Sequence, residues 1–372
     1  CLLCPEARRN MNIGIPKERR PFEYRVGLSP AGIQMLAGGG LFCFIEHDAG
    51  IGAGFSDQDY EAAGARIVYS PHEVFGRADL LLKVARPLTE EIEWLRPGVT
   101  LAGLLHLGSA RQDKIILLEE KGITAIAYEN IRYTDGRAPI RIPLSQIGGQ
   151  LIAQIAANLL QNNAGGKGIL LEGVAGVPPA EVVIIGAGVA GSNATKAFLG
   201  MGAHVTVLDI NINALNRIFE SARGVVTMIS NPINLARACA YADVVVGAVL
   251  VPGRRPPTVV TREMVRQMKT RSILMDVSID EGGCIETSRP TNHEQSTFIE
   301  EGIIHYCVPN IPSVVARTST HAFLNAAFPF IQEITNKGAE IAVKDNPAIE
   351  NGTAVFKGEL RHIKRLLPKD PD

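Results

Sequence analysis

The sequence predicts an α/β protein made of two doubly wound parallel-sheet domains, joined by long helices, with the active site in the cleft between them. Three observations support this class. Short apolar strands alternate with helical segments along most of the chain, a pattern typical of parallel sheets. A glycine-rich turn follows a buried strand in mid-chain rather than near the start. At 372 residues, the chain exceeds one typical domain, so two are expected.

The first domain is expected to contain strands at residues 12–16, 42–47, 80–84, 100–105 and 123–127, with helices at 30–38 and 57–63 between them. A helix-rich stretch at residues 319–343 has no strand partner nearby, so we expect it to return to this domain. The substrate domain is therefore predicted as residues 11–140 plus 318–372. Residues 1–10 lack the apolar core of a secretory signal and are expected to be an appended leader.

A long apolar-periodic helix at residues 145–161 follows and is suited to linking two domains. The second domain, predicted as residues 141–317, then repeats the alternation of strand and helix. Its first strand begins at Val182 and leads into the glycine-rich turn. The remaining strands are expected at 203–209, 225–229, 244–248, 272–277 and 304–307.

The glycine-rich turn has the spacing of the Rossmann dinucleotide fingerprint. Gly186 permits the tight turn after the strand, Gly188 lets the backbone approach a pyrophosphate, and Gly191 lets the helix pack on its strand. The helix N-terminus offers N–H groups to the phosphates. The sequence therefore predicts a dinucleotide-binding domain. The alternative is a Rossmann-like domain that kept the fold but lost dinucleotide binding.

An acidic residue ends the second strand of this unit. Asp209 lies about 20 residues after the glycines, where its carboxylate accepts hydrogen bonds from the ribose hydroxyls. The same charge would repel a 2′-phosphate. NAD is therefore the predicted cofactor, in preference to NADP.

Composition and charge exclude several classes of function. The net charge of −1 gives no reason to expect nucleic acid or an anionic membrane as a partner. No apolar run approaches the length of a membrane span. Six cysteines are too sparse for a disulfide scaffold, and the Cys1 and Cys4 pair lacks a second ligand pair, so no metal site is expected. A reducing, cytoplasmic setting is the simplest interpretation.

Three residues stand where strands end, which is where open α/β sheets bind ligands. Arg25 could grip a carboxylate with two hydrogen bonds, or it could be a solvated surface arginine. His106 ends an apolar strand and suits general acid–base work, or it could be a hydrogen-bonded core histidine. Asp280 precedes two glycines, either over a cleft or as a turn-forming residue.

Ordered motifs along the chain resemble the alanine dehydrogenase and proton-translocating transhydrogenase family from Met11 to about Gly358. They are Ile13-Gly-Ile-Pro-Lys-Glu18, Glu23-Tyr-Arg-Val26, Leu80-Leu-Leu-Lys-Val84, Leu105-His-Leu107, Ala127-Tyr-Glu129, Ile184-Ile-Gly-Ala-Gly188, Thr206-Val-Leu-Asp-Ile-Asn211, Gly247-Ala-Val-Leu-Val-Pro-Gly253, Asp280-Glu-Gly-Gly-Cys284 and Thr318-Ser-Thr320. The Pro143-Leu-Ser-Gln-Ile-Gly148 segment resembles NAD-dependent L-alanine dehydrogenases, whereas the Arg-Ala-Gln loop and membrane segments of the transhydrogenases are absent from the sequence.

The resemblance implies roles for these residues. Arg25 would bind the substrate carboxylate, His106 would transfer protons at the reacting atom, and Asp280 would assist deamination. It also implies a homo-oligomer, either a hexamer or a dimer. The residues placed around NAD are Ser145, Gly186, Ala187, Gly188, Val189, Ala190, Gly191, Asp209, Ser230, Val249, Leu250 and Asn310.

One position departs from the family pattern. The family motif Lys-Val-Lys-Glu-Pro, whose second lysine reaches the substrate, here reads Lys83-Val-Ala-Arg-Pro87, with Ala85 in the place of that lysine. Lys83 should face the same side of the strand and Arg86 the opposite side, and both are candidate substrate-binding residues. Losing a hydrogen bond to a charged group, about 1.5–3 kcal/mol, would slow a reaction by roughly tenfold to a few hundredfold.

These observations predict an enzyme that oxidatively deaminates an L-amino acid to a 2-oxo acid and ammonia, and the reverse, with a substrate that need not be alanine. A non-catalytic NAD(H)-binding homologue is the first alternative. A hydride carrier for a separate transhydrogenase subunit is the second. The expected partners are small-molecule substrates, with neither nucleic acid nor membrane.

Overall fold

The computed structural model describes residues 11–36, 40–251 and 254–363, and it divides into two compact units. Unit 1 comprises the chain up to Leu144 and from Ser313 onward, and unit 2 comprises Ser145–Pro312. The expected leader at residues 1–10, with Cys1 and Cys4, lies outside the described residues, as do Gly38 and Gly253. None of the described helices is long and apolar enough to cross a membrane.

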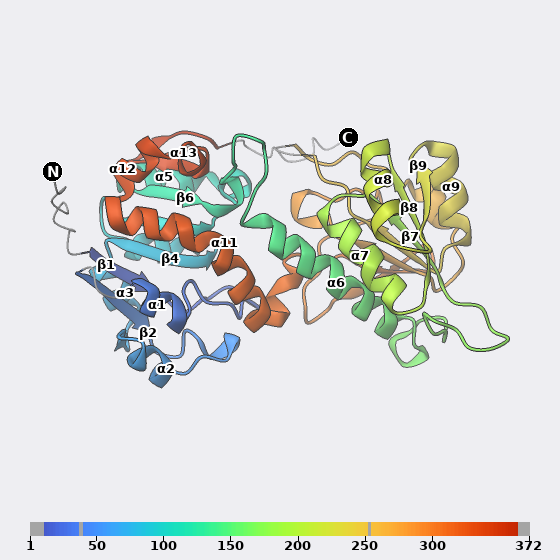
Figure 1. Ribbon diagram of the computed structural model, residues 1–372, viewed down its shortest axis with the longest axis horizontal. Coiled ribbons are helices and arrows are strands. Elements are labelled where there is room, and N and C mark those ends of the chain that lie inside the picture. The colour runs from blue at the N-terminus through green and yellow to red at the C-terminus, as the bar shows by residue number, and fades with distance from the viewer. Residues whose placement is uncertain (1–10, 37–39, 252–253, 364–372) are drawn as a thin grey trace. The chain divides into compact units, whose positions relative to one another are not determined.

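Unit 1 is built on an eight-stranded sheet in the order β15-β14-β6-β5-β4-β1-β2-β3 (Figure 1). Its parallel strands are β1 (Met11–Ile15), β2 (Leu41–Glu46), β3 (Arg66–Val68), β4 (Leu80–Ala85), β5 (Thr100–Leu104) and β6 (Thr124–Ala127). The last two strands, β14 (Thr353–Phe356) and β15 (Glu359–Leu360), pair antiparallel at the edge. This final pair was not predicted from the sequence, so the expectation that the C-terminal stretch has no strand partner was wrong.

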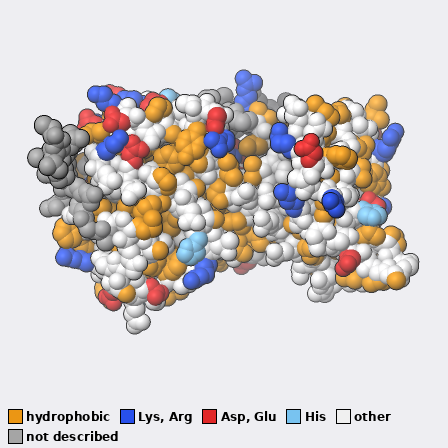
Figure 2. All heavy atoms as spheres, viewed as in Figure 1, with side chains coloured by type: hydrophobic (Ala, Val, Ile, Leu, Met, Phe, Trp, Pro, Cys, Tyr) orange, Lys and Arg blue, Asp and Glu red, His pale blue; other side chains and the backbone are white. Residues whose placement is uncertain are grey.

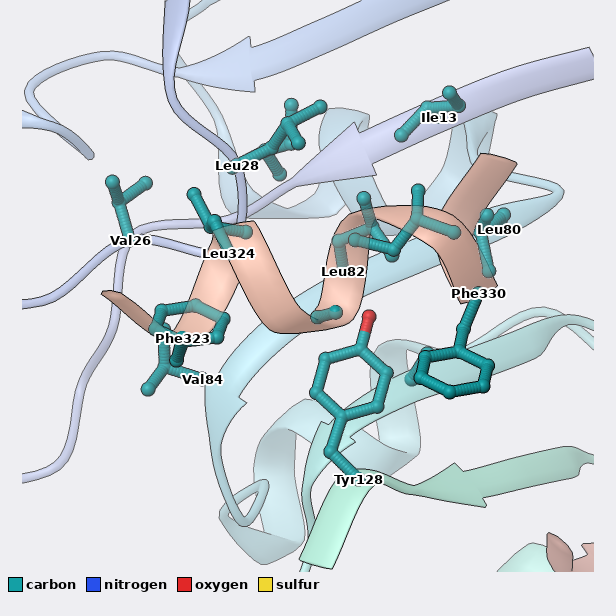
Figure 3. Packing of buried hydrophobic residues seen from close by; sticks show 14 of the residues in the cluster. Ile13, Val26, Leu28, Leu80, Leu82, Val84, Tyr128, Phe323, Leu324 and Phe330 are labelled. Atoms are coloured by element: carbon teal, nitrogen blue, oxygen red, sulfur yellow. The ribbon is translucent and has the colours of Figure 1, made fainter. Parts of the chain in front are cut away.

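Helices cover both faces of this sheet and bury its apolar side chains. They are α1 (Pro30–Leu36), α2 (Asp57–Ala62), α3 (Pro71–Arg77), α4 (Thr89–Trp94), α5 (Gln112–Glu120), α11 (Ala316–Lys337), α12 (Ala339–Asp345) and α13 (Pro347–Gly352). On one face, Phe323 and Phe330 of α11 join Leu82 and Tyr128 in a core cluster (Figure 3). The other face packs against α3 and α5 through Phe75 and Leu118.

Unit 2 contains a seven-stranded sheet in the order β12-β13-β11-β10-β7-β8-β9. The strands are β7 (Glu181–Ile185), β8 (His204–Asp209), β9 (Val226–Ile229), β10 (Val244–Gly247), β11 (Ile273–Asp276), β12 (Thr297–Glu300) and β13 (Ile303–Tyr306), and only β12 is antiparallel. The helices are α7 (Val189–Gly200), α8 (Ile212–Ser221), α9 (Pro232–Tyr241) and α10 (Arg262–Arg266), and α6 (Arg141–Leu159) precedes the sheet. The predicted class of two doubly wound parallel-sheet domains is confirmed.

Each sheet reverses its strand order at one point, which is where ligands bind in such folds. In unit 2, β8 and β10 flank β7, so the reversal lies at the carboxyl end of β7, beside the glycine-rich turn. In unit 1, β2 and β4 flank β1, so the loops after β1 and β4 border the corresponding position. On the face shown in Figure 2, basic and acidic side chains are interspersed, as the balanced net charge suggests.

Candidate active site

The glycine-rich turn of unit 2 has the geometry that its three glycines were expected to provide. Gly186 adopts a positive φ of 109°, and a Cβ there would lie 2.3 Å from the Ala248 carbonyl oxygen. A Cβ on Gly191 would lie 1.8 Å from the Gly186 carbonyl oxygen, so only glycine lets α7 pack this closely on the turn. A Cβ on Gly188 would meet nothing within 4 Å. The backbone at Gly188 is therefore open to an approaching group.

The first turn of α7 is arranged to receive an anion. The N-cap is Gly188, which has no side chain to satisfy the first N–H groups, including those of Val189 and Ala190. The long helix α6, which carries Ser145, packs closely against this turn at Gly149. A Cβ on Gly149 would lie only 2.3 Å from the Ala190 carbonyl oxygen. This close contact of helices was not predicted from the sequence.

Asp209, at the end of β8, lies against the same turn. Its Oδ2 accepts a hydrogen bond from the Ala187 N–H at 2.6 Å, and its Oδ1 accepts one from the Asn211 N–H at 2.8 Å. The Ser230 N–H donates to the Asp209 carbonyl oxygen at 2.9 Å. The structure therefore brings Asp209, Ala187 and Ser230 together.

A second group of predicted residues meets after β10 and β11. Val249 accepts a hydrogen bond from the Ser278 hydroxyl at 2.8 Å, and the exposed Leu250 follows it. Asp280 is exposed, and its Oδ2 accepts a hydrogen bond from the Asn310 N–H at 3.2 Å. Asn310 adopts a positive φ of 56°.

Asp276 holds the loop that carries Asp280, a role that sequence reasoning missed. Its buried carboxylate accepts hydrogen bonds from the N–H groups of Ser278 at 3.0 Å, Cys284 at 3.0 Å and Ile285 at 3.3 Å. Burial nevertheless raises the pKa of this carboxyl above its ordinary value. An aspartate at the end of a strand, four residues before the predicted Asp280, was the available signal.

Arg25 in unit 1 is buried rather than solvated, so the surface interpretation was wrong. Glu23 holds its guanidinium with two hydrogen bonds, from Nε at 2.7 Å and from Nη2 at 2.6 Å. Such a paired contact fixes the plane of the guanidinium. Arg25 is therefore oriented by the loop that follows β1.

His106 stands exposed just beyond β5, so the interpretation as a core histidine was wrong. It adopts a left-handed backbone conformation with φ 42°, which is uncommon for a non-glycine residue. The buried Glu129 holds this turn, because its carboxylate accepts hydrogen bonds from the His106 N–H at 2.6 Å and the Leu105 N–H at 3.0 Å. Glu129 positions this turn, a role that was not predicted from the sequence.

Lys83 is held inside unit 1 by two carboxylates. Its Nζ lies 2.7 Å from Glu91 Oε1 and 3.1 Å from Glu18 Oε2, and all three side chains are buried. Burial acts to lower the pKa of Lys83, but the two carboxylates outweigh it and raise the pKa. The structure thus gives Lys83 partners other than a substrate.

The pairing of β4 with β5 is irregular near the end of β4. Leu82 pairs with Ala102 and Ala85 pairs with Leu104, so three steps on β4 match two on β5. This irregularity breaks the strict two-residue period, on which the placement of Lys83 and Ala85 on one side depended. Arg86 lies beyond the strand, where its Nη1 donates to the His106 carbonyl oxygen at 3.2 Å and to Ser109 Oγ at 2.9 Å.

Comparison with known proteins gives the family of this two-unit, dinucleotide-fingerprint fold. The model for "Alanine dehydrogenase/PNT, N-terminal domain" matches residues 14–147, and that for the C-terminal domain matches residues 152–363. The alanine dehydrogenase of Mycolicibacterium smegmatis is 43% identical over 97% of both chains. That of Bacillus subtilis is 44% identical over 95% of this chain and 93% of its own.

Solved structures agree with these matches. An L-alanine dehydrogenase superposes with a TM-score of 0.91 at 41% identity, covering 95% of this chain and 97% of its own. A transhydrogenase from Sinorhizobium meliloti has a TM-score of 0.81 at 24% identity, covering 94% and 100%, and shares the fold. The chain belongs to the alanine dehydrogenase/PNT family. It is an oxidoreductase of the alanine dehydrogenase type.

Proposed function

We propose that the protein uses NAD to deaminate an L-amino acid oxidatively to a 2-oxo acid and ammonia, and that it also catalyses the reverse. The observation that carries the proposal is the exposed His106 turn, held by Glu129, in a chain that is 43% identical to a curated alanine dehydrogenase. In the forward direction, amino acid, NAD⁺ and water give 2-oxo acid, ammonium, NADH and a proton.

The residues of unit 2 fit NAD. The open backbone at Gly188 and the uncapped start of α7 suit a pyrophosphate, and Asp209 suits ribose hydroxyls rather than a 2′-phosphate. When bound, NAD supplies the acceptor for the hydride that leaves the substrate Cα. The residues proposed to hold it are Ser145, Gly186 to Gly191, Asp209, Ser230, Val249, Leu250 and Asn310.

The chain's own side chains would bind the substrate and move protons. Arg25, oriented by Glu23, would bind the α-carboxylate. His106 would accept the proton that leaves the substrate amino group and later return it to the departing ammonia. Asp280 would take a proton from the water that adds to the imine carbon. Removing the His106 imidazole or the Asp280 carboxylate should therefore reduce kcat more than it weakens NADH binding.

The substitution at Ala85 is part of this proposal. By resemblance, Ala85 takes the place of a substrate-binding lysine, and Lys83 is held by Glu18 and Glu91. Arg86 is the cation that lies beside His106. We therefore assign substrate contact to Arg86 in preference to Lys83.

The test is to mix the purified protein with NAD⁺ and each of a panel of L-amino acids and to follow NADH absorbance. The reverse reaction is tested with the matching 2-oxo acids, ammonium and NADH. We expect turnover with at least one pair in both directions, and a large loss in His106→Ala. Tight NADH binding with no turnover of any pair would contradict the proposal and favour a non-catalytic NADH-binding homologue.

The family resemblance also supports a homo-oligomer, either a hexamer or a dimer. Light scattering after size-exclusion chromatography measures the mass directly. A single-chain mass, 39.9 kDa, would contradict this part of the proposal.

A further inference from the structure

Three cationic side chains gather at the segment that follows β4. Arg20 Nε donates to the Arg86 carbonyl oxygen at 2.7 Å, and Lys114 Nζ donates to the Pro87 carbonyl oxygen at 3.0 Å. Arg86 itself reaches the His106 carbonyl oxygen. The three side chains come from the loop after β1, the end of β4 and α5, so the fold brings them together from distant parts of unit 1.

The charges of this cluster are not balanced as those of its neighbours are. Lys83 has Glu18 and Glu91, and Arg25 has Glu23. Within the described part of the chain, no carboxylate lies within 4.0 Å of the side-chain nitrogens of Arg20, Arg86 or Lys114. Glu129, the acid that interacts with Arg86, is engaged by two backbone N–H groups, and the acids that interact with Lys114 are Asp113 and Glu91.

The cations also perturb one another. Burial and the charge of Arg20 lower the pKa of Arg86 below its usual range. Burial, followed by the charges of Arg20 and Arg86, lowers the pKa of Lys114. Hydrogen bonds to backbone carbonyl oxygens orient the three side chains but do not neutralise their charges. An anion bound at this position would relieve the repulsion and add charge-assisted hydrogen bonds.

We propose that Arg20, Arg86 and Lys114 form a subsite for a second carboxylate of the substrate, so that the preferred amino acid has an acidic side chain. This inference rests on the proposed function, because it names the substrate class of that same site. Arg25 is assigned the α-carboxylate, and a methyl side chain such as that of alanine has nothing to pair with three cations. The neighbouring Ala85 contributes only a methyl group where a longer substrate would extend.

The kinetic test compares each acidic amino acid with its amide of nearly equal size. We expect kcat/KM for L-aspartate or L-glutamate to exceed that for L-asparagine or L-glutamine at least tenfold. Arg86→Gln should lower this ratio by about tenfold to a few hundredfold, the loss of one charged hydrogen bond. Arg86→Lys should retain part of the preference. The matched control is Arg111→Gln, which removes an exposed arginine paired with Asp113 and should leave the ratio unchanged.

A binding measurement makes the subsite testable without turnover. Calorimetry on the NADH-saturated protein compares succinate with butyrate, a monoacid of equal length. We expect succinate to bind at least tenfold more tightly, with this advantage lost in Arg86→Gln and kept in Arg111→Gln. Equal binding of the two acids, or an advantage that survives Arg86→Gln in a protein with unchanged Tm, would overturn the inference. Absence of amino-acid turnover alongside the predicted succinate result would instead contradict only the proposed function.

Discussion

The glycine-rich turn of unit 2 and the carboxyl edge of β4 and β5 in unit 1 are built in different ways. The turn is a run of six residues, Gly186 to Gly191, whose shape follows from its own glycines. The His106 turn is fixed by Glu129, 23 residues away, and by Arg86, 20 residues away. A locally determined element can be identified from a sequence motif, whereas an element held by distant side chains can be identified only once the fold is known.

The largest expected effect comes from breaking the buried ion pairs of Lys83 in unit 1. Lys83→Met leaves Glu18 and Glu91 buried without their cation, which should cost about 3–5 kcal/mol in the free energy of unfolding. Because the pKa of Lys83 is raised, its contribution is fully present below the ordinary lysine pKa and is lost as pH rises through the raised value. Denaturant unfolding from neutral to strongly alkaline pH measures both effects.

The control for this change is Lys357→Met, which removes an exposed cation paired with Glu340 and should cost about 0–1 kcal/mol. If Lys83→Met were as mild as Lys357→Met while raising KM for the amino acid, Lys83 would be a substrate ligand rather than a structural cation.

The next effect tests the local character of the glycine-rich turn. Gly191→Ala puts a Cβ 1.8 Å from the Gly186 carbonyl oxygen, so α7 must shift. Such overpacking typically costs about 1–3 kcal/mol, and NADH affinity should fall with stability. In Gly188→Ala, where the added Cβ meets nothing, Tm should stay constant while NADH affinity falls. Thermal melting measures the loss of stability, and calorimetric NADH titration measures the loss of affinity.

Gly200→Ala is the control within the same helix, because nothing lies near its added Cβ. It should stabilise the protein by up to about 1 kcal/mol through lower backbone entropy and leave NADH binding unchanged. Equal NADH binding by all three variants would show that the turn does not hold the cofactor.

A third effect tests whether the distant Glu129 holds the His106 turn in unit 1. In Glu129→Gln an NH2 group, which cannot accept a hydrogen bond, replaces one of the two oxygens that accept the Leu105 and His106 N–H groups. The unmet N–H should cost about 1–3 kcal/mol, and kcat should fall with a changed pH profile as His106 leaves its left-handed conformation. NADH affinity should not change. A variant with wild-type kcat and pH profile would show that Glu129 does not position His106.

The smallest expected effect concerns Tyr128, whose ring packs beside Phe330 with its hydroxyl directed toward α11 (Figure 3). The hydroxyl is buried and has no hydrogen-bond partner within the described part of the chain. Tyr128→Phe removes this unsatisfied group, so unfolding free energy should stay constant or rise by up to about 1 kcal/mol. A clear loss of stability would mean that the hydroxyl has a partner, such as a bound water.

Sequence reasoning reached the features that local pattern encodes. The turn around Gly186, the acid at Asp209 and the exposed strand-end residues His106 and Asp280 could be named because motif and strand end are contiguous. Glu129 and the cluster around Arg86 could not, since their partners lie about 20 or more residues away in the chain. The register irregularity between Leu82 and Ala85 lies in the pairing of β4 with β5, so the sequence of β4 alone could not predict it. Strand β14, which pairs with β6, follows three helices in the chain and is only four residues long, so no strand pattern indicated it.

The most direct test of the central claim follows the hydrogen that leaves Cα. The amino acid that the protein uses best is supplied with deuterium at Cα, and the NADH formed with NAD⁺ is examined by mass spectrometry. We predict one deuterium in each NADH produced, and none in NADH formed from the unlabelled amino acid. NADH that forms without deuterium, or no NADH from any amino acid, would contradict the assignment of this chain as an amino-acid dehydrogenase.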